Sequence, residues 1–178
     1  MSAYADQRVL VVGGASGVGL LVHVVVSAGE TPMGRVDALP LADAYAAMDS
    51  KFWGAYRTAR SVRVRPSGSL TLLAGYLSQR PDRASALQSA INAALVRGLA
   101  LEYAPLRVNA VSPGLLRTPL WEGMDVTARE RMYEAATQRL PVGRVREAAD
   151  VAKAVLFVTG NAHATGTTVY VDGGGTIA

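Results

Sequence analysis

The chain has 178 residues, of which 50% are hydrophobic and 18% charged, and its net charge is +4. This length predicts one domain over residues 1–178, and this balance excludes a disordered, charge-rich chain. The chain has no cysteine, which excludes disulfides, thiolate metal sites and a cysteine nucleophile. Its only histidines are His23 and His163, so we expect no metal site.

Membranes and nucleic acids are not expected as partners. No apolar run reaches the roughly 18 residues of a membrane span, and the first residues do not resemble a signal peptide. We therefore expect a cytoplasmic protein. Arginines cluster at positions 57, 60, 63 and 65, but no aromatic interleaving or nucleic-acid motif accompanies them. We interpret the cluster as the solvated end of a helix.

Strands and helices alternate along the sequence. In chain order we predict strands at 8–12 and 23–26, a helix at 41–62, a turn at Pro66-Ser67-Gly68, a strand at 69–73, a helix at 84–103, a strand at 106–111, helices at 126–140 and 147–159, and a strand at 167–171. The strands are nearly all apolar. This pattern predicts an α/β fold, a Rossmann-like doubly wound parallel sheet in three layers.

The helix at 41–62 shows an apolar rhythm with steps of three and four residues. Its members are Leu41, Ala44, Tyr45, Met48, Phe52, Tyr56 and Ala59. This spacing predicts one buried helix face.

A glycine-rich turn follows the first strand directly. Its sequence is Gly13-Gly14-Ala15-Ser16-Gly17-Val18-Gly19. Glycines permit a tight turn and let backbone N–H groups approach a phosphate, to which the following helix offers its positive end. The strand before it is the context that a dinucleotide-binding turn requires. The alternative is a tight turn that binds nothing.

Four segments, in the right order, resemble the short-chain dehydrogenase/reductase family. They are the glycine turn, Val24-Val25-Val26-Ser27-Ala28-Gly29, Arg107-Val108-Asn109-Ala110-Val111-Ser112-Pro113-Gly114, and Thr165-Gly166-Thr167-Thr168-Val169-Tyr170-Val171-Asp172-Gly173-Gly174. The resemblance implies an NAD- or NADP-binding domain that transfers a hydride. It implies adenosine and pyrophosphate contacts at Gly13, Ser16, Gly17, Val18 and Gly19. It also implies ribose contacts at Ala28 and Gly29, and nicotinamide contacts at Pro113, Gly114 and Thr118.

The family's Asn-Ser-Tyr-Lys catalytic tetrad is not kept in this chain. An alignment that runs backward from Arg97–Pro105 puts Ser85 at the tyrosine position and Ser89 at the lysine position. Lys51 takes the asparagine position and Gly75 approximately the serine position. Lys51 and Tyr76 (with Arg80 nearby) are candidate substitutes, because proton transfer needs an acidic group near the cleft. Each could instead be a solvated side chain, and Ser85 and Ser89 could be plain helix residues.

The chain also lacks a segment that the family places after Gly19. Only eight residues, 14–21, separate the first two strands, whereas a parallel crossover needs about 10–12 residues. We expect either a rearranged topology or residues missing between Gly19 and His23, and hence a sheet that is contracted or incomplete at one edge. The family's NAD-versus-NADP reading residue would lie in this segment.

Two function classes remain open. The first is an NAD(P)-dependent oxidoreductase acting on a small alcohol or carbonyl compound, with a weak hint of an apolar substrate from the segment 115–124 and its Trp121. The second is a non-catalytic binding or scaffold protein that keeps the fold without the chemistry. We also expect a homodimer or homotetramer. The helix at 84–103 carries small residues that would let a second copy approach closely, namely Ala86, Ala90, Ala93, Ala94 and Gly98.

Overall fold

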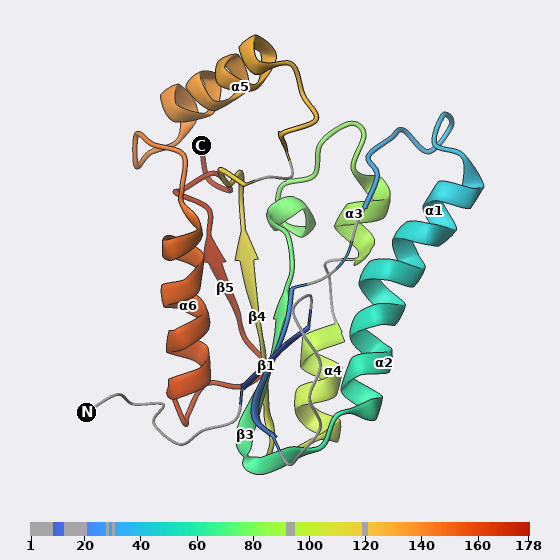
Figure 1. Cartoon of the computed structure of the whole chain (residues 1–178), viewed down its shortest axis with the longest axis vertical. Helices are drawn as coiled ribbons and strands as arrows, with labels where there is room; N and C mark the ends of the chain where they lie inside the picture. Colours follow the sequence, from blue (N-terminus) through green and yellow to red (C-terminus); the bar gives the residue numbers. More distant parts are fainter. Residues whose placement is uncertain (1–8, 13–20, 28, 30, 92–94, 119–120) are drawn as a thin grey trace.

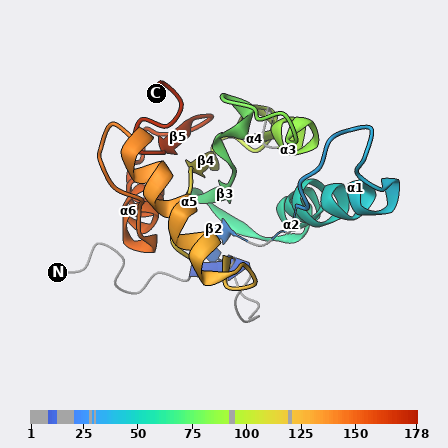
Figure 2. The same cartoon turned by 90° about the horizontal axis from the view of Figure 1, so that it is seen from above.

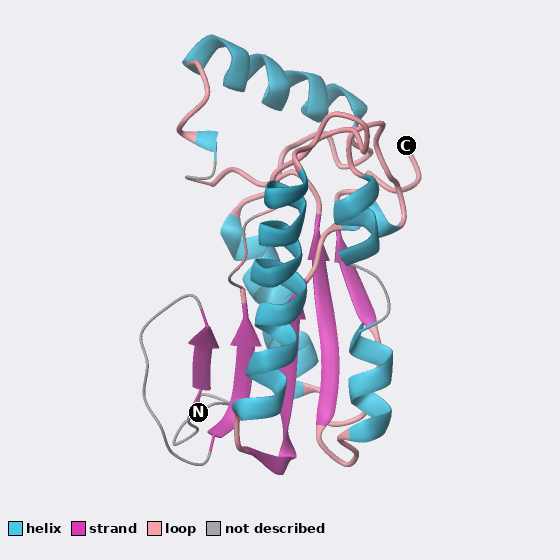
Figure 3. Cartoon of the chain, turned by 90° about the vertical axis from the view of Figure 1, so that its right-hand side faces the viewer, coloured by secondary structure: helices cyan, strands magenta, loops and turns pink. Residues whose placement is uncertain are grey.

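The computed structural model describes residues 9–12, 21–27, 29, 31–91, 95–118 and 121–178. Five parallel strands form one sheet in the order β1-β2-β3-β4-β5. They are β1 (Val9–Val12), β2 (Leu21–Val26), β3 (Val64–Leu73), β4 (Arg107–Pro113) and β5 (Thr168–Val171). Figure 3 shows the strands pointing in the same direction, with β1 at one edge.

Helices cover both faces of the sheet, as the sequence predicts for a three-layer fold (Figure 1). On one face lie α1 (Leu41–Ala47), the π-helical turn η1 (Met48–Trp53), α2 (Gly54–Ser61), α3 (Ala86–Ile91) and α4 (Leu95–Glu102). On the other face lies α6 (Ala148–Gly160). None of the helices in the described ranges is long and apolar enough to cross a membrane.

The sheet contributes to a separate core on each face. On the α2 and α4 face, Leu70 and Val108 are fully buried and pack with Ala55, Ala59 and Leu99. On the α6 face, the core consists of Val111, Val151 and Val158, with Leu73, Val169 and Val171 packed against them. Burial on both faces explains why the strands read as apolar runs rather than as alternating patterns.

Helix α5 (Val126–Arg139) lies across the carboxyl ends of the strands (Figures 1 and 2). Its amino terminus is capped by Asp125, whose side chain accepts a hydrogen bond from the Ala128 N–H at 3.0 Å. On its inner side, Tyr133 and Ala136 are buried and pack with Val145. α5 therefore covers part of the edge at which the strands end.

The predicted helix at 41–62 forms, but only part of its predicted apolar face is buried. Leu41 and Tyr45 are exposed, whereas the buried side chains are those of Ala47, Ala55 and Ala59. The turn η1 changes the rotational phase between α1 and α2, which a pattern of threes and fours does not reveal. Alanine side chains also let the helix approach the sheet closely, while Leu41, Tyr45 and Tyr56 stay exposed.

The predicted turn at Pro66-Ser67-Gly68 is part of a strand. β3 begins at Val64, and its pairing with β2 shifts register between Leu21 and His23. A Cβ atom on Gly68 would lie only 2.0 Å from the Val22 carbonyl oxygen. Glycine at this position therefore allows the close approach of a neighbouring strand at an irregularity.

β1 and β2 pair side by side in parallel, with Val9 opposite His23 and Val12 opposite Val26. The two strands are thus direct neighbours, although we expected either a rearranged topology or residues missing between Gly19 and His23. Most of the connection between them, residues 13–20, lies outside the described residues, so both alternatives stay predictions. The predicted helix at 84–103 appears as α3 and α4, and residues 92–94 between them also lie outside the described part.

Candidate functional site

The carboxyl ends of the parallel strands meet at one edge of the sheet (Figure 1). β2 ends at Val26, β3 at Leu73, β4 at Pro113 and β5 at Val171. In open α/β sheets, ligands bind outside these ends. Of the predicted cofactor residues, Gly13, Ser16, Gly17, Val18, Gly19 and Ala28 lie outside the described residues, whereas Gly29, Pro113, Gly114 and Thr118 are described.

Gly29 follows β2 and has a backbone φ of 140°, a value that L side chains rarely adopt. A Cβ atom there would lie 2.7 Å from the Cδ atom of Lys51. The backbone at the end of β2 is therefore in direct contact with the Lys51 side chain. Lys51, a candidate substitute for the catalytic tetrad, thus lies beside the end of this strand.

A large open cleft begins at Gly29. It has a volume of ≈ 860 Å³ and is lined by Gly29, Thr31, Pro32, Asp43, Ala46, Ala47 and Ser50. The loop that forms one wall is held to α3, because the Gln88 side-chain N–H donates a hydrogen bond to the Pro32 carbonyl oxygen. Small-molecule pockets are typically about 300–1,000 Å³, so the cleft is large enough for a substantial part of a nucleotide.

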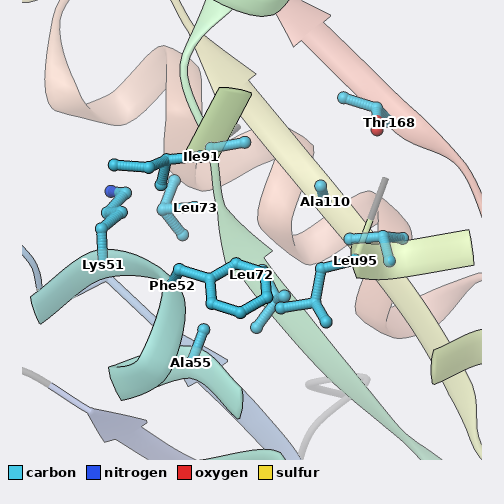
Figure 4. Close-up of a pocket in the computed structure, with 11 residues that line it drawn as sticks. Lys51, Phe52, Ala55, Leu72, Leu73, Ile91, Leu95, Ala110 and Thr168 are labelled. Atoms are coloured by element: carbon cyan, nitrogen blue, oxygen red, sulfur yellow. The ribbon is translucent and has the colours of Figure 1, made fainter. Parts of the chain in front are cut away.

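Lys51 lies in the π-helical turn η1 and lines a second, much smaller cavity of ≈ 40 Å³. π-Helical turns occur frequently at functional sites. The other lining residues are Phe52, Ala55, Leu72, Leu73, Ala74, Ile91, Leu95, Val96, Ala110 and Thr168. Figure 4 shows the Lys51 amine beside the side chains of Ile91 and Leu73, with Phe52 below it.

Desolvation by burial lowers the pKa of the Lys51 amine from its ordinary value. Asp49, two residues earlier, is engaged elsewhere, because its carboxylate pairs with Arg57 at 2.8 Å. Within the described ranges the structure gives Lys51 no hydrogen bond or ion pair. An amine of this kind can donate or accept a proton, or attack an electrophile.

Gly114 lies against a buried arginine that the sequence analysis did not single out. Arg146 is only 4% exposed, and a Cβ atom on Gly114 would lie 2.6 Å from its Nη1 atom. The same Nη1 donates a hydrogen bond to the Leu115 carbonyl oxygen at 3.2 Å. Burial lowers the pKa of Arg146, and the nearby carboxylate of Asp172 opposes this shift. Arg146 follows α5 in a connecting loop, where sequence alone suggests a solvated side chain.

The hydroxyl groups of Ser85 and Ser89 form local hydrogen bonds, Ser85 in the turn just before α3 and Ser89 within α3. The Ser85 Oγ accepts a hydrogen bond from the Asp82 N–H at 2.7 Å and donates one to the Asp82 carbonyl oxygen at 2.9 Å. The Ser89 Oγ donates to the Ser85 carbonyl oxygen at 2.8 Å. These bonds favour the interpretation of both serines as structural residues, Ser89 in the helix and Ser85 in the turn before it.

Tyr76 and Arg80 follow β3 at the carboxyl edge. Tyr76 begins the 3₁₀ turn η2 (Tyr76–Ser78). A negative charge on its phenol oxygen would raise the pKa of Arg146. Arg80 Nη1 donates a hydrogen bond to the Gly175 carbonyl oxygen at 2.7 Å. Tyr76 thus remains a candidate at this edge, whereas Arg80 holds the loop that follows β5.

A family model described as enoyl-(acyl carrier protein) reductase matches residues 10–176. The chain belongs to the short-chain dehydrogenase/reductase family. Among the relatives, galactitol 2-dehydrogenase (L-tagatose-forming) of Cereibacter sphaeroides is 32% identical over 73% of this chain and 54% of its own length. The short-chain dehydrogenase/reductase MalC of Malbranchea aurantiaca is 34% identical over 61% of this chain and 42% of its own.

Solved structures of this family confirm the Rossmann-like fold. A small-chain dehydrogenase in complex with NADPH is 41% identical, with a TM-score of 0.84, and the match covers 90% of this chain and 76% of the other. A second small-chain dehydrogenase is 33% identical, with a TM-score of 0.83, and the match covers 97% of this chain and all of the other. The chain spans about half the length of the first curated relatives it matches.

The four positions that correspond to the family's tetrad lie in different surroundings in this chain. Lys51 lines a small cavity over β3 and β4, whereas the hydroxyls of Ser85 and Ser89 bond to nearby backbone atoms at the start of α3. Gly75 precedes η2 in an extended conformation. Among the described residues there is no group of three or more His, Asp or Glu side chains that could hold a metal ion.

Proposed function

We propose that this protein is an NAD(P)-dependent oxidoreductase that acts on a small carbonyl compound or alcohol. The observation that carries the proposal is the cleft of ≈ 860 Å³ that opens at Gly29, beside the carboxyl end of β2. The 41% identical neighbour in complex with NADPH supports the choice of ligand. The bound nicotinamide would supply or accept the hydride.

The described residues fit a dinucleotide. Gly29 leaves the backbone without a side chain at the rim of the cleft, and its φ of 140° excludes most replacements. Gly114, which follows β4, likewise has no room for a side chain, because an added Cβ atom would collide with the Arg146 guanidinium. The buried Arg146 cation lies at the edge where a dianionic pyrophosphate would bind. We place the adenosine and ribose near Gly29 and the nicotinamide near Pro113, Gly114 and Thr118.

Proton transfer during carbonyl reduction needs an acid in place of the family's tyrosine. Lys51 and Tyr76 are the candidates, because each lies at the carboxyl edge and carries a transferable proton. We propose an apolar substrate, although Trp121 itself packs with α5 and its indole N–H donates to the Leu116 carbonyl oxygen at 2.9 Å. We further propose a homodimer or homotetramer in the cytoplasm.

A fluorescence titration with NADH and with NADPH tests the proposal. Saturable binding of one or both is expected, followed by oxidation of the reduced cofactor when short aldehydes or ketones are added. Lys51→Met should reduce kcat much more than it weakens cofactor binding, and Tyr76→Phe is the matched test of the second candidate. Binding of neither cofactor would refute the proposal.

A non-catalytic binding protein is the second candidate function. The observation that favours it is that Ser85 and Ser89, at the tyrosine and lysine positions, carry neither a phenol nor an amine and bond only locally at the start of α3. Tight cofactor binding without turnover of any alcohol or carbonyl compound would support this second function over the first.

A further inference from the structure

The cavity beside Lys51 combines an amine with apolar walls. Phe52, Leu72, Leu73, Ile91 and Leu95 contribute hydrophobic side chains around it (Figure 4). Its volume is ≈ 40 Å³, whereas a cavity needs roughly 10–15 Å³ on this measure to hold one water molecule. The cavity therefore has room for three or four groups of the size of water or methylene, which corresponds to a short aliphatic chain.

Nothing in the described surroundings of Lys51 compensates its charge. The elements packed around the cavity are β3, α3, α4 and β4, and they present only apolar side chains to it; Thr168 of β5 adds one hydroxyl-bearing residue. Burial accordingly lowers the pKa of the amine. An uncharged amine is a nucleophile, and lysines desolvated in hydrophobic pockets form Schiff bases with carbonyl compounds.

We propose that Lys51 captures short aliphatic aldehydes as a Schiff base in this cavity. The Nζ atom attacks the carbonyl carbon and forms a carbinolamine by transferring one proton to the oxygen. Loss of the second nitrogen proton and of the hydroxyl as water then leaves the C=N bond. The step is reversible and consumes no oxidant or reductant. It needs no nicotinamide, so the inference does not rest on the proposed function.

The shape and polarity of the cavity define the ligand. An aldehyde of three carbons fills it after water has left, while its methyl end contacts the side chains of Leu73 and Ile91. A carboxylate on the ligand would have to be desolvated among apolar residues, which is costly. We therefore expect propanal to react well and glyoxylate or a bicyclic aromatic aldehyde to react poorly.

The chain provides its own comparison, because Lys153 is its only other lysine. Lys153 is exposed on α6, on the opposite face of the sheet. The intact protein is incubated with propanal at neutral pH, reduced with cyanoborohydride and mapped by peptide mass spectrometry. We expect propylation of Lys51 several-fold faster than that of Lys153. Equal rates at the two lysines, or faster reaction at Lys153, would overturn the proposal.

Variants separate the cavity from the amine. Leu73→Phe and Ile91→Phe each keep Lys51 but fill the space beside it, so selective propylation should be lost while circular dichroism shows an intact fold. Lys153→Met should leave the Lys51 rate unchanged. If selective labelling of Lys51 survives in a folded cavity-filled variant, or extends to the bicyclic aldehyde, the cavity does not bind the ligand and the proposal fails. Failure here would leave the cofactor titration unaffected, and the reverse also holds.

Discussion

At the scale of single residues, a buried amine destabilises the folded chain whenever it carries a proton. Burial lowers the pKa of Lys51 in the folded protein, so the unfolded chain binds more protons at this site. Lys51→Met removes this cost and keeps a flexible chain of similar length. We expect its thermal midpoint at pH 7 to rise by about 2–4 °C, the change that roughly 1 kcal/mol produces in a chain of this size.

The change of stability with pH gives a second check of this prediction. The stability of the unmodified protein should increase as the pH rises from the lowered folded-state pKa toward the ordinary lysine value of 10.5, because the protonated form disappears. The advantage of Lys51→Met should therefore be largest near neutral pH and shrink as the solution becomes alkaline. An advantage that grows with pH would contradict the assignment. Lys153→Met, at an exposed position, is the control.

Gly29 provides a second test at a single position. Its φ of 140° and the 2.7 Å that would separate an added Cβ atom from the Lys51 Cδ atom both disfavour alanine. We expect Gly29→Ala to lower the free energy of unfolding by about 1–3 kcal/mol. Gly98→Ala is the matched control, because a Cβ atom there meets nothing within 4 Å. In the interior of α4 that change should stabilise by up to about 1 kcal/mol. Chemical denaturation of both variants measures the difference.

At the scale of elements, Arg107 links β4 to the end of α6. Its guanidinium is 9% exposed and donates to the carbonyl oxygens of Val158 and Thr159 at 2.7 Å and of Asn161 at 2.8 Å. These are terminal carbonyls of α6, where a cation also opposes the helix dipole.

Arg107→Leu should lower the free energy of unfolding by about 3 kcal/mol, because buried carbonyl groups lose charged donors. Hydrogen exchange should show that the last turn of α6 loses protection. Arg97→Leu removes an exposed arginine from α4 and should change stability by less than about 0.5 kcal/mol. Equal effects of the two substitutions would contradict the role assigned to Arg107.

The order and type of the main elements could be predicted from the sequence, because buried parallel strands are apolar runs and the helices between them are periodic. The details that escaped prediction depend on contacts between distant residues. β3 extends through Pro66-Ser67-Gly68 because Gly68 fits against the Val22 carbonyl group of another strand. Leu41 and Tyr45 are exposed because a π-helical turn rotates this part of the helix. The spacing of apolar residues does not reveal such a turn.

The candidate site was predictable only where a motif had a known place in the fold. The family pattern singled out Lys51 as a candidate, and in the structure its side chain contacts Gly29. Arg146 could not be found, because its burial arises from the approach of a connecting loop to Gly114 after β4. The hydrogen bonds of Ser85 and Ser89 within one turn depend on where α3 begins, which the sequence left uncertain by a few residues.

At the scale of the whole molecule, α3 and α4 expose small and apolar side chains. Ala86 and Ala90 are exposed on α3, and Leu101 on α4 is 83% exposed. We predict that two copies pair through this surface about a twofold axis. Ala90→Arg should convert a dimer to the 18.6 kDa monomer in light scattering at micromolar concentration.

The control for the pairing surface is the same substitution on another helix. Ala135 is exposed on α5, so Ala135→Arg should leave the dimer intact. A monomer of the unmodified chain, or dissociation by both substitutions alike, would exclude α3 and α4 as the pairing surface.

The turn η1 separates two segments of one helix that can be adjusted independently. A single-residue deletion between Met48 and Trp53 would restore regular i→i+4 bonding and rotate α1 by about 100° relative to α2. α1 buries only Ala47 and could accept such a rotation, but the Lys51 side chain would no longer lie against Gly29. The extra residue thus acts as a spacer that sets the direction of one side chain. Insertions or deletions in η1 would therefore keep the fold but turn a different side chain toward the ligand.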